Sequence, residues 1–254
     1  MFNKFLAIKC TAYGMTDTGR TRNHNEDNIH LNNEYNLYIV ADGMGGHQAG
    51  EVASKMAIKI IEKTLLKHQA PDDSDNDIEF PEVQTVSKAI EDTNISINQS
   101  NNDRGLLKGK GMGTTVVGCW YLSRAKMSII FNVGDSRAYS FYKDELTQIT
   151  TDHSLLQLWK DKCFEGDQPP ANVLTKALGP YPEVAPDILL YPGKKGEIIF
   201  LCSDGLTTMV NDREIETTLK QFKNSPDKIP EQLIIKANQA GGEDNISVVV
   251  IVFS

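Results

Sequence analysis

The segment LYIVADGMGG, residues 37–46, joins a continuous apolar run to an aspartate and a glycine-rich corner. The unbroken apolar run predicts a strand over Leu37–Ala41 that is buried on both faces. The glycines after Asp42 allow the chain to turn sharply and bring its own carbonyl groups close to a bound species. Taken alone, Asp42 is equally a turn former or a helix cap. The segment predicts a buried strand that ends in a carboxylate at a tight corner.

Three further acidic clusters stand in similar settings along the chain. One is Asn25–Asp27, another is Ser203–Gly205 directly after the apolar run Ile198–Leu201, and the last is Gly241–Asn245 directly before the run Ile246–Phe253. Carboxylates at strand ends without a basic partner nearby in the sequence are costly to gather in one place. The usual reason for gathering them is a hard divalent cation bound by oxygen ligands.

Composition and charge exclude several classes of protein. The chain has 254 residues, of which 40% are hydrophobic and 24% charged, which is typical of a globular protein. A net charge of −8 argues against a protein that binds nucleic acid through phosphate contacts. We find no signal peptide and no apolar run of membrane-spanning length. The cysteines are far apart, as in free thiols of a reducing cytoplasm. We therefore expect a cytoplasmic protein with no nucleic-acid or membrane partner. We also expect a monomer.

The order of predicted elements favours an antiparallel two-sheet core with helices outside rather than a doubly wound parallel sheet. Helices are expected in pairs, and a flap is expected at about residues 154–172, irregular from Lys160 to Asn172. No internal repeat or shift in composition divides the chain, so we expect one domain over residues 1–254. The expected helices are Ala49–Lys67, Val83–Asn102, Asp212–Phe222, opened by Asn211 as N-cap, and Pro230–Gln239. The expected strands are Leu6–Met15, Ile29–Asn33, Leu37–Ala41, Met112–Tyr121, Lys126–Val133, Ala138–Tyr142, Glu145–Ile149, Asp187–Leu190, Glu197–Cys202 and Asn245–Phe253.

A gathered set of carboxylates indicates hydrolytic chemistry. A pair of divalent cations can activate water and neutralise charge on a leaving group, and phosphate esters need such help most. Arg22, four residues before Glu26, could bind two phosphate oxygens at once, although a lone arginine is often only a surface residue. His24 and His47 are candidates for a general acid. A cysteine nucleophile is excluded, because no cysteine is followed by an arginine six residues later.

Eight segments together resemble the protein phosphatase 2C family, the metal-dependent serine/threonine protein phosphatases, in its bacterial form. The resemblance extends from Thr16 to Val250, and it depends on the order of the segments as much as on any one of them. The segments are residues 16–27 (TDTGRTRNHNED), 40–47 (VADGMGGH), 111–115 (GMGTT), 133–139 (VGDSRAY), 151–155 (TDHSL), 172–179 (NVLTKALG), 202–206 (CSDGL) and 242–247 (GEDNIS).

The resemblance implies an α+β fold, a four-layer αββα sandwich of two packed antiparallel sheets flanked by helix pairs. It also implies two Mn²⁺ or Mg²⁺ ions, and a third in some bacterial members. The implied roles are as follows: Asp42 bridges the ions, Gly43 lends its carbonyl, Asp204 and Asp244 bind one ion, and Glu26 binds the other directly or through water; Asp27 and Asn245 support the ligands, Asp135 with Asp204 matches the third site, and Arg22 holds the phosphate. Arg22, Asp42 and Asp204 are thus the expected catalytic residues.

Three departures from the family leave questions open. Met44 stands where some members have a histidine that acts as an acid, so the leaving-group acid is either His47 or a water on a metal. Lys176 stands where arginine is more usual, and the flap is short. The expected function is hydrolysis of phosphoserine and phosphothreonine on proteins, opposing a cognate serine/threonine kinase. The alternatives are a catalytically idle interaction module of the same fold and a hydrolase of small phosphoesters.

Overall fold

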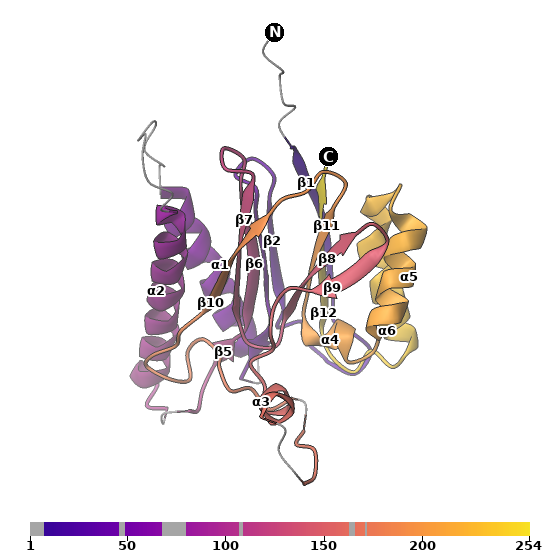
Figure 1. The fold of residues 1–254 in the computed structure, drawn as a ribbon. Coiled ribbons are helices and arrows are strands. Elements are labelled where there is room, and N and C mark those ends of the chain that lie inside the picture. The colour runs from indigo at the N-terminus through magenta and orange to yellow at the C-terminus, as the bar shows by residue number, and fades with distance from the viewer. Residues whose placement is uncertain (1–7, 46–48, 68–79, 107–108, 163–165, 171) are drawn as a thin grey trace.

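A computed structural model describes residues 8–45, 49–67, 80–106, 109–162, 166–170 and 172–254. Two antiparallel five-stranded sheets form the centre of the molecule (Figure 1). Sheet A has the order β1 (Cys10–Asp17), β12 (Ile246–Phe253), β11 (Ile198–Cys202), β8 (Arg137–Tyr142) and β9 (Glu145–Gln148). Sheet B has the order β10 (Asp187–Pro192), β7 (Met127–Val133), β6 (Val116–Leu122), β3 (Leu37–Ala41) and β2 (Asn28–Asn32). A short ribbon pairs β4 (Gly43–Met44) with β5 (Gly113–Thr114).

Helix pairs cover the outer face of each sheet. Helices α1 (Ala49–Lys67) and α2 (Pro81–Asp103) pack on sheet B, and α5 (Asp212–Phe222) and α6 (Ile229–Gln239) pack on sheet A (Figure 1). The short helices are α3 (Leu155–Asp161), α4 (Asp204–Thr207) and the 3₁₀ turn Pro226–Lys228. Within the described residues, no helix is both long and apolar enough to span a membrane. The predicted α+β fold, a four-layer αββα sandwich, is confirmed.

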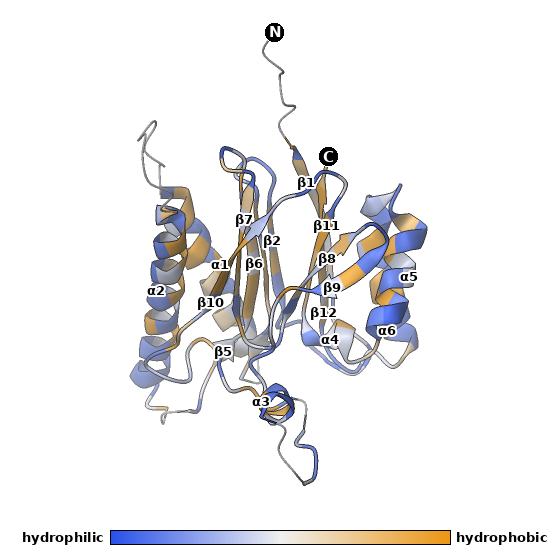
Figure 2. Cartoon of the chain, in the orientation of Figure 1, coloured by the Kyte–Doolittle hydropathy of each residue, from blue (hydrophilic) through white to orange (hydrophobic). Residues whose placement is uncertain are grey.

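Burial on both faces explains the continuous apolar runs of the central strands. In β3, Leu37 and Ile39 join the core beneath α1 and α2, whereas Tyr38 and Val40 join the core between the sheets. Successive side chains of a strand point to opposite faces, so a strand inside a four-layer sandwich needs apolar residues at every position. Figure 2 shows the result: the strands are mostly hydrophobic, whereas the outer helices mix hydrophobic and hydrophilic residues.

Most predicted elements are present, with differences that have local causes. Helices α1 and α5 have their predicted bounds, and the predicted N-cap Asn211 forms a capping box, in which its side chain accepts from the Glu214 backbone N–H. The strand predicted over Met112–Tyr121 is wrong, because it is two strands, β5 and β6, separated at Thr115. The pattern also does not predict α3, which opens the flap and is capped by Ser154.

Candidate metal centre

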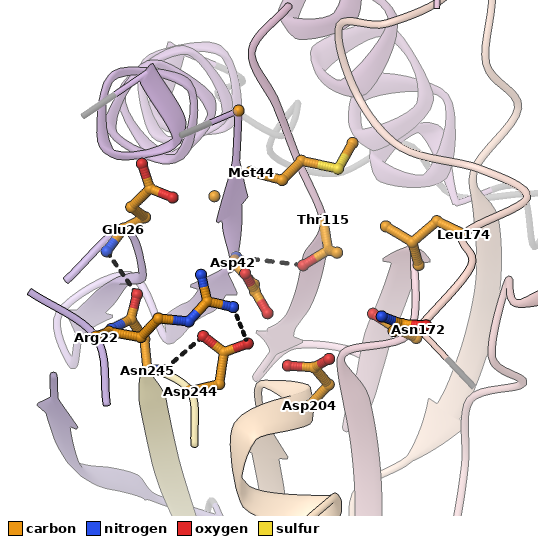
Figure 3. Close-up of a pocket in the computed structure, with 13 residues that line it drawn as sticks. Arg22, Glu26, Asp42, Met44, Thr115, Asn172, Leu174, Asp204, Asp244 and Asn245 are labelled. Atoms are coloured by element: carbon orange, nitrogen blue, oxygen red, sulfur yellow. Dashed lines mark hydrogen bonds and ion pairs between the residues drawn. The ribbon is translucent and has the colours of Figure 1, made fainter. Parts of the chain in front are cut away.

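A cavity of about 260 Å³ lies at one end of the sandwich, where loops from both sheets meet (Figure 3). Strand ends and loops that are far apart in the sequence contribute its walls. In Figure 3 Asp42, Asp204 and Asp244 face one another, and Glu26 lies farther along the same wall as Arg22. The residues that line the cavity are Arg22, Glu26, Asp42, Gly43, Met44, Gly45, Thr115, Asp135, Asn172, Leu174, Asp204, Asp244 and Asn245. The predicted ligand positions and the predicted phosphate-binding arginine are therefore brought together.

Backbone hydrogen bonds fix the Asp42 corner. The carbonyl oxygen of Asp42 accepts from the Thr115 N–H and from the Thr114 hydroxyl, each at 2.8 Å, and the Asp42 N–H donates to Thr115 Oγ1 at 3.2 Å. The next residue, Gly43, pairs with Thr114 in the β4–β5 ribbon. A Cβ atom at Gly43 would clash with the Gly50 backbone at the start of α1, so no other residue fits at this corner.

Asp204 lies at the first turn of α4, directly after sheet A strand β11. Its Oδ1 atom is buried and has no hydrogen-bond partner within the described part of the chain. Its carboxyl group lies near that of Asp42, and its charge contributes to the raised pKa of Asp42. A Cβ atom at the neighbouring Gly205 would clash with the backbone of Asn245. The glycine therefore allows the end of β11 to lie close to the start of β12. The sheets thus place two carboxyl groups on the walls of the same cavity.

Asn245 connects the start of β12 to the loop that carries Glu26. Its Oδ1 accepts from the Glu26 N–H at 2.8 Å, and its Nδ2 donates to the carbonyls of Thr18 and His24, each at 2.9 Å. The Glu26 side chain in turn accepts from the Gly50 N–H at 3.2 Å, at the N-terminal end of α1. Asn245 therefore fixes the backbone of Glu26 next to the start of β12.

Asp27 is buried behind the lining residues. Ser203 Oγ donates to its Oδ2 at 2.7 Å, and its Oδ1 has no hydrogen-bond partner among the described residues. Burial, with smaller contributions from the charges of Asp204 and Asp244, raises the pKa of Asp27 to about 7. Asp27 thus holds the end of β11 through Ser203 and adds a buried carboxyl group to the cluster.

The other carboxyl groups of the cavity also hold protons more tightly than usual. Burial raises the pKa of Asp42 well above its ordinary value, and the charges of Asp27 and Asp204 raise it further. Burial and then the charge of Asp204 raise the pKa of Asp135 to about 7. The pKa of Asp204 is raised by burial and by the charge of Asp244. Gathered carboxyl groups repel one another, so a cation from outside would lower the free energy of the charged form.

Arg22 is the cationic side chain that lines the cavity. Its Nη2 atom lies 2.8 Å from Asp244 Oδ2, and the Arg22 side chain is 52% exposed. In this conformation no group of three or more Asp, Glu, His or Cys side chains in the described segments surrounds one point as an ion site. The donor set nevertheless fits a hard divalent cation, because it consists of carboxylates and a glycine carbonyl and leaves Asp204 Oδ1 and Asp27 Oδ1 unbonded.

Asp135 is held by the connection between β7 and β8. The Gly134 N–H donates to His153 Nδ1 at 3.0 Å, and the hydroxyls of Ser136 and Thr115 lie 2.7 Å apart. A second cavity, of about 510 Å³, adjoins the first and shares Asp135, Asn172 and Asp204 with it. Asp135 therefore lies between the two cavities, both of which Asp204 also lines.

Several residues that line the first cavity have no role predicted from the sequence. Thr115, Asn172 and Leu174 all lie in segments that carry the family resemblance, and that is the signal that could have found them. His24 is exposed and is not among the described residues that line the cavity, so it is poorly placed as an acid. His47, the other candidate, lies outside the described residues.

Comparisons with known proteins agree with this geometry. A family model described as Protein phosphatase 2C matches residues 18–233. Serine/threonine phosphatase stp of Listeria innocua is 36% identical over 250 residues, which cover 93% of each chain. The S. agalactiae serine/threonine phosphatase structure has a TM-score of 0.83 and 31% identity, and the match covers 96% of this chain and 100% of that one.

A further solved structure, the catalytic domain of the serine/threonine protein phosphatase PstP, is a complex with 2 manganese ions. It has a TM-score of 0.79 and 30% identity, and the match covers 97% of this chain and 99% of that one. These matches extend over nearly the whole sequence and include the segments that build the cavity. The chain belongs to the protein phosphatase 2C family, among its bacterial serine/threonine phosphatases.

Proposed function

We propose that this chain hydrolyses phosphoserine and phosphothreonine on proteins with two bound divalent cations, Mn²⁺ or Mg²⁺. The observation that carries the proposal is the set of carboxylates from both sheets, with raised pKa values and unbonded buried oxygens, around one cavity. The manganese complex of the related PstP catalytic domain supports the choice of cation. When bound, such a pair of ions activates water for attack on phosphorus and offsets the charge of the phosphate.

The proposed ligands are those that the family resemblance implies, and their shared position on the cavity wall supports them. Asp42 lies at the centre and would contact both ions, with the Gly43 carbonyl beside it; Asp204 and Asp244 would bind one ion and Glu26 the other. Asp135 and Asp204, between the two cavities, would hold a third ion. Asp27 and Asn245 keep these side chains in place through Ser203 and the Glu26 backbone.

Arg22 would hold the phosphate group of the substrate. It lies at the cavity, its side chain is half exposed, and its guanidinium can bind two phosphate oxygens at once. The proton for the serine or threonine leaving group would come from His47 or from water, since Met44 cannot supply one.

The cellular setting is part of the same proposal. We place the protein in the cytoplasm as a monomer with one catalytic domain over residues 1–254, acting on phosphoproteins made by a cognate serine/threonine kinase. The buried free thiols Cys10, Cys119 and Cys202 support a reducing compartment. The match of the family model to residues 18–233 supports one domain.

The decisive experiment is a phosphatase assay with a metal series and a chelator control. We expect Mn²⁺ or Mg²⁺ to support release of phosphate from phosphoserine and phosphothreonine peptides and from an aryl phosphate, and chelation to abolish it. No turnover with any metal would favour the idle interaction module. Faster turnover of nucleotides than of phosphopeptides would favour the small-phosphoester hydrolase.

A further inference from the structure

Helix α2 carries three asparagines along one side, at positions 94, 98 and 101. Spacings of four and three residues place their side chains in one row on a helix. Asn94 and Asn101 are almost fully buried, with 1% and 2% of their surface exposed. A buried amide is costly unless its donors and acceptor are all bonded. In this row the partners are mostly backbone groups of other segments.

Asn101 forms a two-point contact with the backbone of Met112. Its Nδ2 donates to the Met112 carbonyl at 2.8 Å, and its Oδ1 accepts from the Met112 N–H at 3.0 Å. The same Nδ2 reaches the Gly179 carbonyl at 3.3 Å, to which Asn98 also donates at 2.8 Å. The Asn101 amide thus bonds both the N–H and the carbonyl of Met112, as a neighbouring strand would.

Met112 is the residue directly before β5, and β5 holds the Asp42 corner. Gly113 and Thr114 pair with β4, which follows Asp42. The Thr114 hydroxyl donates to the Asp42 carbonyl, and Thr115 bonds both backbone groups of Asp42. A displacement of Met112 would therefore shift β5 and, through the hydrogen bonds of Thr114 and Thr115, the position of Asp42.

Asn94 is an equally buried amide with different partners. Its Oδ1 accepts from the Gly179 N–H at 2.8 Å, and its Nδ2 donates to the carbonyls of Tyr181 and Pro182, each at 3.0 Å. It holds the segment that follows Gly179 and, within the described chain, has no direct hydrogen bond to the β5 ribbon. The preceding residue, Leu178, exchanges two backbone hydrogen bonds with Thr114 of β5, at 2.9 and 3.1 Å. The helix thus supplies a pair of comparable side chains. Asn101 bonds the residue that is covalently joined to β5, whereas Asn94 reaches β5 only through Gly179 and the Leu178 backbone.

We propose that Asn101 is a positioning residue for cation binding, because it fixes β5 and through it the Asp42–Gly43 corner. Asn94, in contrast, acts on β5 only indirectly, through the segment that contains Leu178 and Gly179. The inference rests on the proposed function to the extent that Asp42 binds the cation.

The test compares Asn101→Asp with Asn94→Asp in the full chain. Each change keeps the accepting oxygen and replaces the donating nitrogen with an oxygen that faces carbonyl groups. Both variants should unfold at a lower temperature in chelator. We expect Asn101→Asp to weaken Mn²⁺ binding, measured by calorimetry, by about 10- to 100-fold, and Asn94→Asp to change the Mn²⁺ dissociation constant far less.

Several outcomes would overturn the assignment. They are wild-type Mn²⁺ affinity in Asn101→Asp, or equal weakening in both variants. If Asn101→Asp does not fold, the milder pair Asn101→Ala and Asn94→Ala decides by the same criterion. Thr114→Val, which removes the hydroxyl bonded to Asp42, should also weaken Mn²⁺ binding, and an unchanged affinity would refute the route through β5. Wild-type turnover of an aryl phosphate tests the proposed function separately, so the two failures are distinguishable.

Discussion

Glu197 and the carboxylates of the cavity are both buried but differ in their hydrogen bonds. Glu197, beside the β10–β11 turn, is fully buried and accepts from the hydroxyls of Ser140 and Tyr191 and from the Lys194 N–H. At the cavity, Asp42 and Asp204 have no ion-pair partner among the described residues, and Asp204 Oδ1 has no bond there at all. Unbonded buried oxygens cost free energy. The fold therefore bonds both carboxylate oxygens of Glu197 and leaves Asp204 Oδ1 unbonded where a cation would complete the set.

Replacing a carboxylate by an amide, at Asp42 and at Glu197, should separate the two sites most clearly. Asp42→Asn removes a charged ligand, and we expect the catalytic rate with Mn²⁺ to fall by at least about 10³-fold, since several kcal/mol of stabilisation depend on the bound ions. Glu197→Gln, the control, should leave the rate near that of the wild type and lower the unfolding temperature, because it alters hydrogen bonds far from the cavity. Rates measured on an aryl phosphate check both, and a fully active Asp42→Asn protein would refute the role of this carboxylate.

Arg22 offers a smaller and more selective effect. Arg22→Ala should raise KM for phosphoesters by about tenfold while kcat changes little, because a charge-assisted contact to the phosphate is lost and the ligands remain. Its exposed ion pair with Asp244 should contribute little to stability, so the unfolding temperature should stay close to that of the wild type. Steady-state kinetics check the prediction. An unchanged KM would mean that the ions alone hold the phosphate.

Asp135 should show a weaker effect than the central ligands. We expect Asp135→Asn to lower turnover severalfold and to remove one weakly bound Mn²⁺ while the tightly bound pair remains, because Asp135 lies at the junction of the two cavities. Calorimetric titration with Mn²⁺ gives the number of ions bound. The same number of ions at the same affinities in the variant would contradict the assignment.

The pH dependence of stability should sharpen the comparison further. Burial raises the pKa of Asp27 and Asp135 to about 7 in the folded chain, from an ordinary value of 3.8. The folded state then binds more protons than the unfolded state between these values, so its stability falls as pH rises through that range. In chelator, the unfolding temperature should be higher at about pH 6.5 than at about pH 8. Saturating Mn²⁺ should cancel or reverse the difference, whereas a higher value at pH 8 in chelator would contradict the prediction.

Below pH 6.5 another group enters. Burial lowers the pKa of His153 from its ordinary value of 6.5, so stability from this residue is lost as the pH falls below that value. The gain in stability from protonated Asp27 and Asp135 should therefore be measured above pH 6.5.

The sequence predicts those parts of the fold and site that depend on local pattern. Strand β3 and the carboxylate that follows it are readable because burial on both faces demands an unbroken apolar run. Helices α3 and α4 are too short for helical periodicity to show. The break at Thr115 depends on bonds to Asp42, which lies 73 residues away in the sequence. The row of asparagines on α2 is not readable either, since the partners of Asn101 are backbone groups of distant loops. The role of His47 stays a prediction.

The cavity draws its walls from both sheets, and this has a consequence for folding. Asp42 follows a strand of sheet B, whereas Asp204 and Asp244 flank strands of sheet A. A cation shared among them would cross-link the two layers at one end. A newly synthesised chain would gain its cation, and with it any catalytic activity, only after the layers have closed on each other, so that hydrolysis would begin with the completed molecule.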